Sequence, residues 1–232
     1  MTHQTRFLQL ALDADALRFG DFTLKSGRVS PYFFNAGRFD SGAALLMLAG
    51  CYADAVEAAG LEFDVLFGPA YKGIPLATAL ACEFARRGRD VPVAFNRKEV
   101  KAHGEGGTLI GAPLAGRRVL VVDDVITAGT AIGEALALIA EAGGVAAGIV
   151  IALDRQEVTG AASSESADAT RTAQATARRS AAQTVTDVHD LPVVAVATLG
   201  DLLGFAGDTP ALAAHAPALR AYRSRFGSST SP

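Results

Sequence analysis

The chain has 232 residues, half of them apolar, which is enough for one main core and a small appendage but hardly for two full domains. Its formal net charge is −3, so nothing in the charge balance favours a nucleic acid or an anionic membrane as partner. The charge argues for a small-molecule site. The N-terminus lacks the charged-then-apolar pattern of a signal peptide and no apolar run reaches the length of a membrane span, so we expect a cytoplasmic protein.

The first forty residues predict one helix and a small extended appendage. Apolar side chains at helical spacing over residues 5–18 indicate a packing helix that ends near Gly20. Residues 22–27 and 30–35 then follow as two short extended segments around a Gly-Arg turn. They are too small to form a core of their own.

Helices and strands alternate from residue 41 onward. The expected helices cover residues 41–60, 74–87 and 129–142, and the expected strands cover residues 63–67, 91–95, 118–122 and 148–153. A long polar loop is expected over about residues 97–108. Strands that are apolar throughout and separated by helices predict an α/β fold with a central, mostly parallel sheet covered on both faces. Ligands of such sheets bind beyond the carboxyl ends of the strands.

A stretch between Val158 and Val185 contains no Leu, Ile, Val, Phe, Tyr or Met, so it cannot bury enough surface to offset its ordering entropy. We expect a disordered insertion over about residues 158–179. A strand at residues 193–196, two C-terminal helices and a frayed end from residue 227 should follow. Cys51 and Cys82 both fall in helix-like apolar patterns without metal-type spacing, which predicts two small core residues.

Residues 119–131 (VLVVDDVITAGTA) run from a strand through two acids into small residues that open a helix. A helix N-terminus offers unpaired N–H groups and positive dipole, and small residues let a phosphate approach the backbone. Asp123 and Asp124, just upstream, are placed to accept sugar hydroxyls. An acid pair that merely caps a helix is common, but the full arrangement predicts a sugar-phosphate site.

Lysine is rare in this chain. Only four of the 21 basic residues are Lys, at positions 25, 72, 98 and 101, and all four lie in loop-like or turn-like contexts. A lysine ammonium is compact, and Arg cannot replace it at a tight phosphate contact, which is one reason why these four positions would be Lys. Residues 97–107 combine Arg97, Lys98, Lys101 and His103 with flexible glycines, which indicates a lid that closes over an anion.

The chain resembles the bacterial orotate phosphoribosyltransferases, within the type I phosphoribosyltransferase family. The resemblance extends over nearly the whole chain and rests on residues 119–131 together with five further segments: 22–27 (FTLKSG), 30–35 (SPYFFN), 67–75 (FGPAYKGIP), 95–107 (FNRKEVKAHGEGG) and 153–157 (LDRQE). It implies a single domain over residues 1–232, with a hood built mainly from about residues 1–40 and the C-terminal region. The activity implied is the transfer of the 5-phosphoribosyl group from 5-phospho-α-D-ribose 1-diphosphate to orotate.

The resemblance also implies roles for individual residues. The sugar diphosphate would contact Lys25, Tyr71, Lys72, Arg97, Lys98, Lys101, His103, Asp123, Asp124, Val125, Ile126, Thr127, Ala128, Gly129, Thr130 and Ala131. Lys101 and His103 are the foremost catalytic candidates, joined by Lys72 and Arg97, and a cis peptide bond that does not involve proline is expected at the turn containing Tyr71 and Lys72. Orotate would contact Lys25, Phe33, Phe34, Thr127 and Arg155. Arg155 supplies the planar cationic fork that a carboxylate needs.

Two further expectations come with the resemblance. Mg²⁺ should be the cofactor, held mainly through the oxygens of the sugar diphosphate rather than by the protein. The lid should reach the active site of a neighbouring subunit, which implies a homodimer with shared sites.

Two other functions stay open at this point. The acceptor base could be a purine or uracil, although Arg155 and the lysine-histidine lid argue against this. Alternatively the fold could serve a regulator that senses the sugar phosphate and binds nucleic acid, but the chain shows neither a helix-turn-helix extension nor a basic face.

Overall fold

The computed structural model describes residues 1–24, 26–101, 107–127, 129–158 and 178–228. The strands are β1 (Leu17–Thr23), β2 (Val29–Phe34), β3 (Val65–Gly68), β4 (Val93–Lys101), β5 (Gly107–Gly111), β6 (Arg118–Asp123), β7 (Val145–Asp154) and β8 (Val193–Thr198). The helices are α1 (His3–Asp13), α2 (Gly42–Ala58), α3 (Gly73–Arg86), α4 (Thr130–Glu141), α5 (Ala181–His189), α6 (Leu199–Asp208) and α7 (Ala216–Phe226), with short 3₁₀ helices η1 (Ala36–Arg38) and η2 (Pro210–His215).

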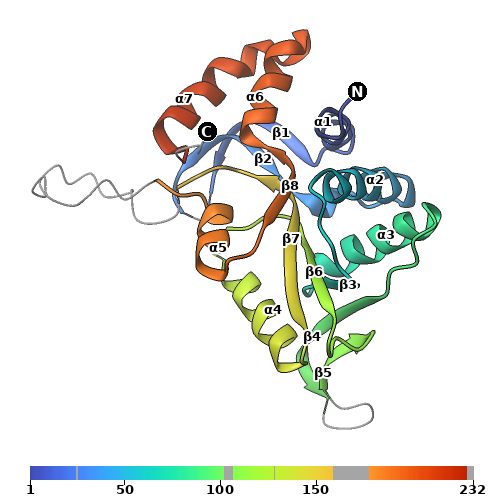
Figure 1. The fold of residues 1–232 in the computed structure, drawn as a ribbon. Helices are drawn as coiled ribbons and strands as arrows, with labels where there is room; N and C mark the ends of the chain where they lie inside the picture. The colour runs from blue at the N-terminus through green and yellow to red at the C-terminus, as the bar shows by residue number, and fades with distance from the viewer. Residues whose placement is uncertain (25, 102–106, 128, 159–177, 229–232) are drawn as a thin grey trace, which may run out of the picture.

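Six strands form the central sheet in the order β5-β4-β3-β6-β7-β8, parallel throughout except for β5 (Figure 1). This confirms the predicted mostly parallel α/β sheet. The chain steps outward from β3 to β4 through α3 and in the opposite direction from β6 to β7 through α4. The strand order therefore reverses between β3 and β6. Open α/β sheets bind ligands at such a switch point, between the two diverging loops, and we refer to this place as the crevice between β3 and β6.

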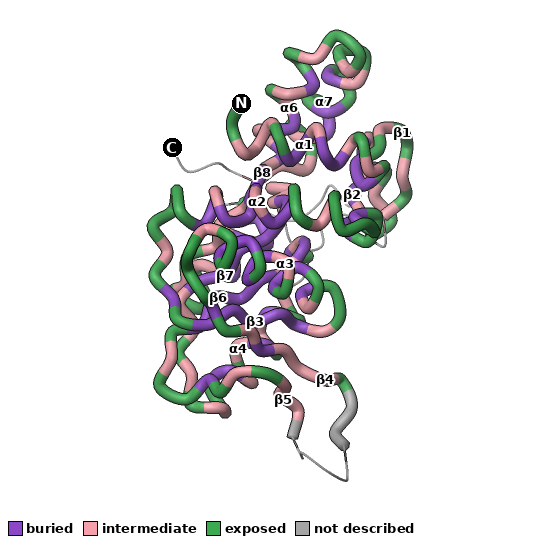
Figure 2. The backbone as a smooth tube through the Cα atoms, turned by 90° about the vertical axis from the view of Figure 1, so that its right-hand side faces the viewer, coloured by how far each residue is buried: buried purple, intermediate pink, exposed green. Residues whose placement is uncertain are grey.

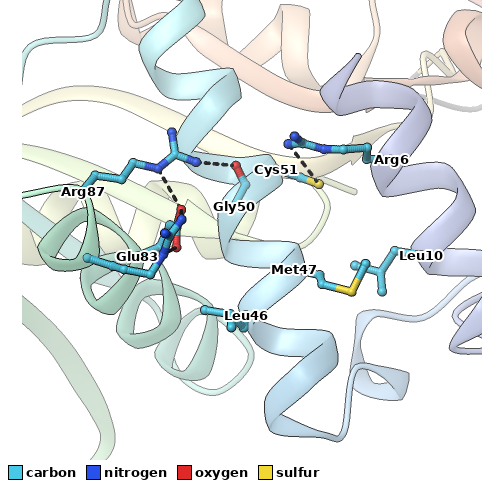
Figure 3. A pocket seen from close by; sticks show the side chains of 9 residues that line it. Arg6, Leu10, Leu46, Met47, Gly50, Cys51, Glu83 and Arg87 are labelled. Atoms are coloured by element: carbon cyan, nitrogen blue, oxygen red, sulfur yellow. Dashed lines mark hydrogen bonds and ion pairs between the residues drawn. The ribbon is translucent and has the colours of Figure 1, made fainter. Parts of the chain in front are cut away.

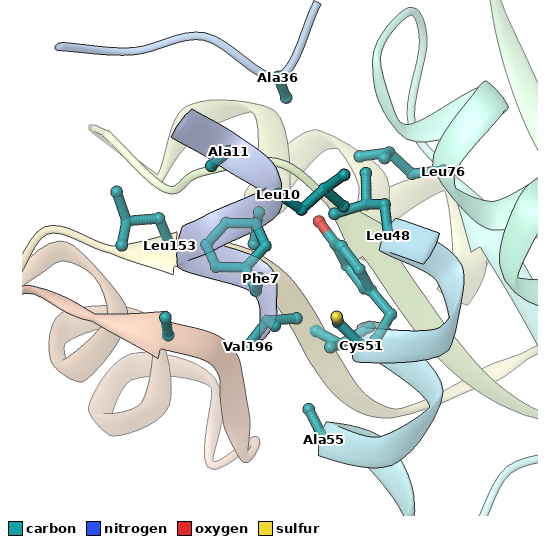
Figure 4. Close-up of a cluster of buried hydrophobic side chains, with 14 of the residues drawn as sticks. Phe7, Leu10, Ala11, Ala36, Leu48, Cys51, Ala55, Leu76, Leu153 and Val196 are labelled. Carbon is teal, nitrogen blue, oxygen red and sulfur yellow. The ribbon is translucent and has the colours of Figure 1, made fainter. Parts of the chain in front are cut away.

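Two apolar clusters, one on each face, hold the sheet between helices. On one face α1, α2 and α3 pack against the strands, and on the other face α4 and α5 do so. Figure 2 shows the buried residues concentrated along the central strands. In the first cluster Phe7, Leu48 and Val196 come together from α1, α2 and β8 (Figure 4). Full burial of one such large side chain contributes roughly 1.5–3 kcal/mol, so α1 is firmly part of the core.

A small antiparallel hairpin of β1 and β2 sits beside α6 and α7 at one end of the molecule (Figure 1). The fully buried ring of Tyr32 on β2 meets the ring of Tyr222 on α7 edge-on, with 6.3 Å between centroids. The first and last parts of the chain are thus packed against each other. They flank the carboxyl end of β7.

The predicted helix over residues 5–18 is wrong at its second half. α1 ends at Asp13, the backbone turns at Asp15 with a φ of 54°, and Leu17 already pairs with Phe34 in the hairpin. Leu17 is buried in this strand as it would be in a helix, so the apolar pattern alone could not distinguish the two. The hairpin pairing, a tertiary effect, decides.

The predicted loop over residues 97–108 is also wrong in part. β4 continues to Lys101 and pairs with β5 in antiparallel fashion, from Ala94 opposite Gly111 to Lys101 opposite Gly107. Backbone hydrogen bonds to β5 stabilise this arm without requiring apolar side chains.

The prediction for one of the two cysteines is wrong. Cys82 is exposed on α3, whereas Cys51 is buried as predicted.

The residues that flank the predicted insertion meet each other. Val158 and Ser180 form an isolated antiparallel bridge, and α5 begins directly afterwards with a capping box in which Ser180 and Gln183 each bond the other's backbone. α5 was not predicted, since only Val185 and Val188 interrupt its small and polar residues. Residues 159–177 lie outside the described part of the chain. None of the helices in the part that is described is long and apolar enough to cross a membrane.

Candidate active site

The crevice between β3 and β6 is bridged by an ion pair. Lys72 lies in the turn after β3 and Asp124 directly follows β6, and the Lys72 Nζ donates to Asp124 Oδ2 at 2.6 Å. The Asp124 side chain is only 8% exposed, whereas that of Lys72 is 54% exposed. A buried carboxylate therefore holds an ammonium group that solvent and ligands can reach.

The turn after β3 lies unusually close to its surroundings. A Cβ atom added at Gly68 would fall 2.4 Å from the carbonyl oxygen of Gly73, so no larger residue fits where β3 meets α3. The next residues are fastened to β4, because the backbone N–H of Ala70 donates to Asn96 Oδ1 at 2.8 Å. The peptide bond between Ala70 and Tyr71 is cis, in the turn where the resemblance implied one.

Asp123 ends β6 in a different environment from that of Asp124. Its Oδ1 accepts a hydrogen bond from the Asp124 backbone N–H at 2.9 Å. Burial, with the Asp124 carboxylate as the next cause, raises the pKa of Asp123 to about 6. The backbone carbonyl of Asp123 accepts from Tyr52 Oη at 2.8 Å, and burial raises the pKa of Tyr52 well above its ordinary value, which keeps this phenol protonated as a donor.

The segment after the acids leads into α4 as the motif predicted. Gly129 caps the helix in a left-handed conformation, with a φ of 78°, and α4 begins at Thr130. Thr127, Thr130 and Ala131 are exposed. The side chain of Ile126 is buried in the second core cluster, so only its backbone is free to face a ligand. The first N–H groups of α4 point into this loop and suit a phosphate.

The predicted lid residues are placed on β4 as far as the structure describes them. Arg97 and Lys98 lie along this strand, and the Lys98 Nζ is 4.9 Å from the centroid of the exposed Tyr71 ring. Lys101 is the last residue of β4, and only its backbone position is described. His103 lies outside the described residues, as do Lys25 and Ala128.

The predicted base-binding residues divide into two groups. Arg155 follows β7, and its guanidinium lies 4.8 Å from the centroid of the buried Tyr32 ring and 3.4 Å from Ser30 Oγ. The ring of Phe33 packs beside that of Phe22 at 5.5 Å. Phe34 is buried and packs against Phe7, so its side chain belongs to the core.

Three residues of this region escaped the sequence reasoning: Tyr52, Asn96 and Glu157. Glu157 accepts a hydrogen bond from Arg155 Nε and forms an ion pair with its Nη2, yet it appeared only as part of a motif. Tyr52 fell within an apolar helix pattern, and Asn96 fell between an expected strand and an expected loop. The only signal in the sequence that could have indicated them was a polar group in an unusual place: Asn96 at the end of a predicted strand and Tyr52 on the buried face of a predicted helix.

The described residues contain no group of three or more His, Cys, Asp or Glu side chains that could hold a metal ion by themselves. A cavity of about 420 Å³ opens elsewhere, between α1, α2 and α3, and none of its lining residues is a candidate site residue (Figure 3).

The chain is similar to known proteins over nearly its whole length. Residues 40–180 match the model of the phosphoribosyl transferase domain. An orotate phosphoribosyltransferase of Xanthomonas euvesicatoria pv. vesicatoria is 68% identical over 98% of this chain and 98% of its own, and one of Stenotrophomonas maltophilia is 63% identical over 97% and 96%. The crystal structure of a Francisella tularensis orotate phosphoribosyltransferase superposes with a TM-score of 0.79 at 37% identity, covering 95% of this chain and 98% of that one. The chain belongs to the orotate phosphoribosyltransferase family.

Proposed function

We propose that the crevice between β3 and β6 is where this chain carries out the reaction of its family, with the residue roles set out below. The 5-phosphoribosyl group passes from 5-phospho-α-D-ribose 1-diphosphate to orotate, which gives orotidine 5′-phosphate and diphosphate in the synthesis of UMP. The observation that carries the proposal is the Lys72–Asp124 ion pair, which joins the two diverging loops beside the N-terminus of α4.

The two ends of the donor need opposite chemistry, and the crevice offers both. The 5-phosphate suits the N-terminus of α4, with Thr127 and Thr130 as hydroxyl donors, and the ribose hydroxyls suit the carboxylates of Asp123 and Asp124. The diphosphate is then left on the side of Tyr71 and Lys72. Lys72 exchanges the Asp124 carboxylate for the diphosphate, which frees an acceptor for the sugar as it supplies charge to the leaving group.

Negative charge accumulates on the leaving diphosphate as the anomeric carbon becomes oxocarbenium-like. Cations that surround the diphosphate stabilise this transition state more than the ground state. We assign this role to Lys72, Arg97, Lys101 and His103, with Lys98 and Lys25 as further diphosphate contacts. Closure of the β4–β5 arm would also exclude water, which would otherwise hydrolyse the donor.

Mg²⁺ is the cofactor we propose, held mainly through the oxygens of the donor. Asp123 and Asp124 provide the hard oxygen atoms that Mg²⁺ prefers, but two carboxylates are too few for a site formed by protein alone. When bound, Mg²⁺ neutralises part of the diphosphate charge.

Orotate would lie near Arg155, Phe33 and Thr127, with Lys25 beside both substrates. Phe34 is retained only as a support for this pocket, since its ring is in the core.

A homodimer with shared sites is the assembly we propose. Leu46 and Met47 on α2 are 53% and 56% exposed and border the cavity between α1, α2 and α3 (Figure 3). Exposed apolar side chains beside a cavity favour a covered protein surface. The partner's lid would then complete the cation set around each diphosphate.

The direct test is the loss of orotate absorbance in the presence of the sugar diphosphate and Mg²⁺. We expect turnover with orotate and none with adenine, hypoxanthine or uracil. Turnover with another base in place of orotate would refute the acceptor that we propose. Loss of activity on chelation, restored by added Mg²⁺, tests the cofactor separately.

A further inference from the structure

The guanidinium of Arg155 is already held by an acid before any substrate is present. Arg155 Nε donates to Glu157 Oε1 at 2.8 Å, and Nη2 approaches the same oxygen at 2.7 Å. Both side chains are mostly buried, with 15% and 13% exposure. The Nε edge of the guanidinium is therefore occupied. Nη2 also donates to Ser30 Oγ at a long 3.4 Å, and among the described residues Nη1 donates no hydrogen bond.

The other oxygen of Glu157 faces a second cation. Arg28, in the turn of the β1–β2 hairpin, has its Nη1 3.7 Å from Glu157 Oε2 and is 12% exposed. Glu157 thus lies between two guanidinium groups, one at each of its carboxylate oxygens. The ring of Tyr32 lies against Arg155, and burial raises the pKa of its phenol, which keeps the phenol neutral.

Glu157 is itself fixed by the last described residues of the chain. It forms an antiparallel bridge with Gly227, and on either side Val158 N–H donates to the Phe226 carbonyl at 3.0 Å and Ser228 N–H donates to the Gln156 carbonyl at 2.7 Å. Gln156 in turn accepts from the backbone N–H of Gly200 at the start of α6, at 3.0 Å. The segment after β7 is tied down on several sides, so Glu157 has little freedom to leave Arg155.

We propose that Glu157 is a positioning residue: it occupies the Nε edge of Arg155, so that the carboxylate of the pyrimidine is received on the Nη edge. The inference rests on the proposed function, in which Arg155 binds that carboxylate. Glu157 need not touch the substrate. Its role is to orient the arginine.

The test compares two nucleotides that differ only in the carboxylate. Orotidine 5′-phosphate carries it and uridine 5′-phosphate lacks it, and calorimetric titration measures both affinities without turnover. In Glu157→Gln, which keeps the shape and removes the charge, we expect affinity for orotidine 5′-phosphate to fall about tenfold, the size of one charge-assisted hydrogen bond. Affinity for uridine 5′-phosphate should stay within about twofold, because the lost interaction concerns only the carboxylate.

A matched control is Asp64→Asn. Asp64 forms a comparable pair with Arg118, through Oδ1 at 2.8 Å and Oδ2 at 3.2 Å, but at the start of β3 and β6, the opposite end of the sheet. The Asp64→Asn variant should keep the affinities for both orotidine 5′-phosphate and uridine 5′-phosphate. Should Glu157→Gln fail to fold, Glu157→Asp keeps the charge with a shorter reach and should give a smaller loss with the same selectivity.

Equal losses for the two nucleotides, or no loss for either, would overturn the role of Glu157. Failure of the proposed function looks different. In that case the unaltered protein would already bind the two nucleotides equally and would not consume orotate.

Discussion

Lys72 is paired with a carboxylate in the free protein and is placed to pair with a substrate diphosphate instead. Its ammonium is held by the buried carboxylate of Asp124, at a distance of 2.6 Å, while most of its side chain is open to solvent. An approaching diphosphate offers more negative charge than one carboxylate does. Lys72 can therefore exchange the Asp124 carboxylate for the diphosphate.

Removal of Lys72 should affect both activity and stability. Lys72→Ala leaves the Asp124 carboxylate buried without its partner, at a cost of roughly 1 kcal/mol in the free energy of unfolding. Transition-state charge stabilisation is lost as well, so we expect kcat to fall at least about a hundredfold. Steady-state kinetics and urea unfolding measure the two effects. A variant with normal kcat would show that Lys72 only pairs with Asp124.

Asp123 should make the stability of the protein depend on pH. Its pKa is about 6 in the folded state, above the ordinary value of 3.8, so the folded state binds the proton more tightly than the unfolded chain. The stabilisation from this group is complete below pH 3.8 and is lost as pH rises through about 6. Asp123→Asn should therefore raise the Tm at pH 7.5 relative to the unaltered protein, and the difference should shrink toward pH 4.5. Parallel thermal melts at both pH values check this, and a difference independent of pH would contradict it.

At this scale the sequence predicted residues that follow strands within one motif, and it missed residues that act across elements. Asp123, Asp124 and Lys72 were predicted because each directly follows a recognisable strand or turn. Tyr52 reaches Asp123 from α2, and Glu157 meets Arg28 from the distant hairpin. Such contacts depend on how helices and strands pack, which spacing along a chain does not determine.

The antiparallel arm of β4 and β5 is the element that departs most from a standard parallel sheet. β4 is parallel to β3 in its first half and continues beyond the sheet's edge to Lys101, paired there only with β5. A two-stranded arm with few neighbours is less stable than the sheet that supports it. This makes the arm suitable for closing over a bound substrate.

Lys101, at the end of this arm, should matter for turnover and not for folding. Lys101→Ala should reduce kcat by orders of magnitude, because the arm would close without its foremost cation. The midpoint of thermal unfolding should shift by less than about 2 °C, because the two-stranded arm contributes little to the stability of the sheet. Activity that survives this change would show that the arm is not the lid.

Mixing Lys101→Ala with inactive Asp124→Asn chains should restore some activity if the sites are shared between subunits.

Elements with strong apolar periodicity were predicted well, and those defined by pairing or capping were not. α2, α3, α4 and the parallel strands, apart from the second half of β4, were each predicted to within a few residues. The end of α1 was misplaced because Leu17 is apolar and buried in either conformation. The second half of β4 and the whole of α5 depend on backbone pairing and on the Ser180 cap, which leave little trace in an apolar pattern.

For the whole molecule, the exposed apolar side chains on α2 lie on the face formed by α1, α2 and α3, away from the buried face of the sheet. Neighbouring ion pairs, such as Arg87 with Asp54 and Glu83, stiffen this face without covering it. Exposed methionine and leucine with arginines beside them are typical of a protein interface.

Self-association should therefore be sensitive to Met47. Met47→Glu places a charge among apolar side chains on this face, and we expect the mass measured by light scattering to change from dimer to monomer. Val188→Glu, on the exposed face of α5, is a control for the loss of an exposed apolar side chain and should leave the mass unchanged. A dimer that persists in Met47→Glu would move the proposed interface elsewhere.

The segment between Val158 and Ser180 should be dispensable. Because these two residues already pair, replacement of residues 160–177 by two glycines leaves a short connection of ordinary hairpin length. Turnover of orotate should stay within about twofold and the Tm should not fall, since loop closure over fewer residues costs less entropy. Insoluble or inactive protein would show that the segment contributes to the fold.

The contact of residues 226–228 with residues 156–158 has a consequence for how the enzyme is made. During synthesis the sheet and the sugar-phosphate loop emerge from the ribosome long before α7 does. The surroundings of Arg155 cannot be completed until residues 226–228 have been translated. We therefore expect a chain that terminates within α7 to retain much of the sheet but to lack a finished pocket for the base.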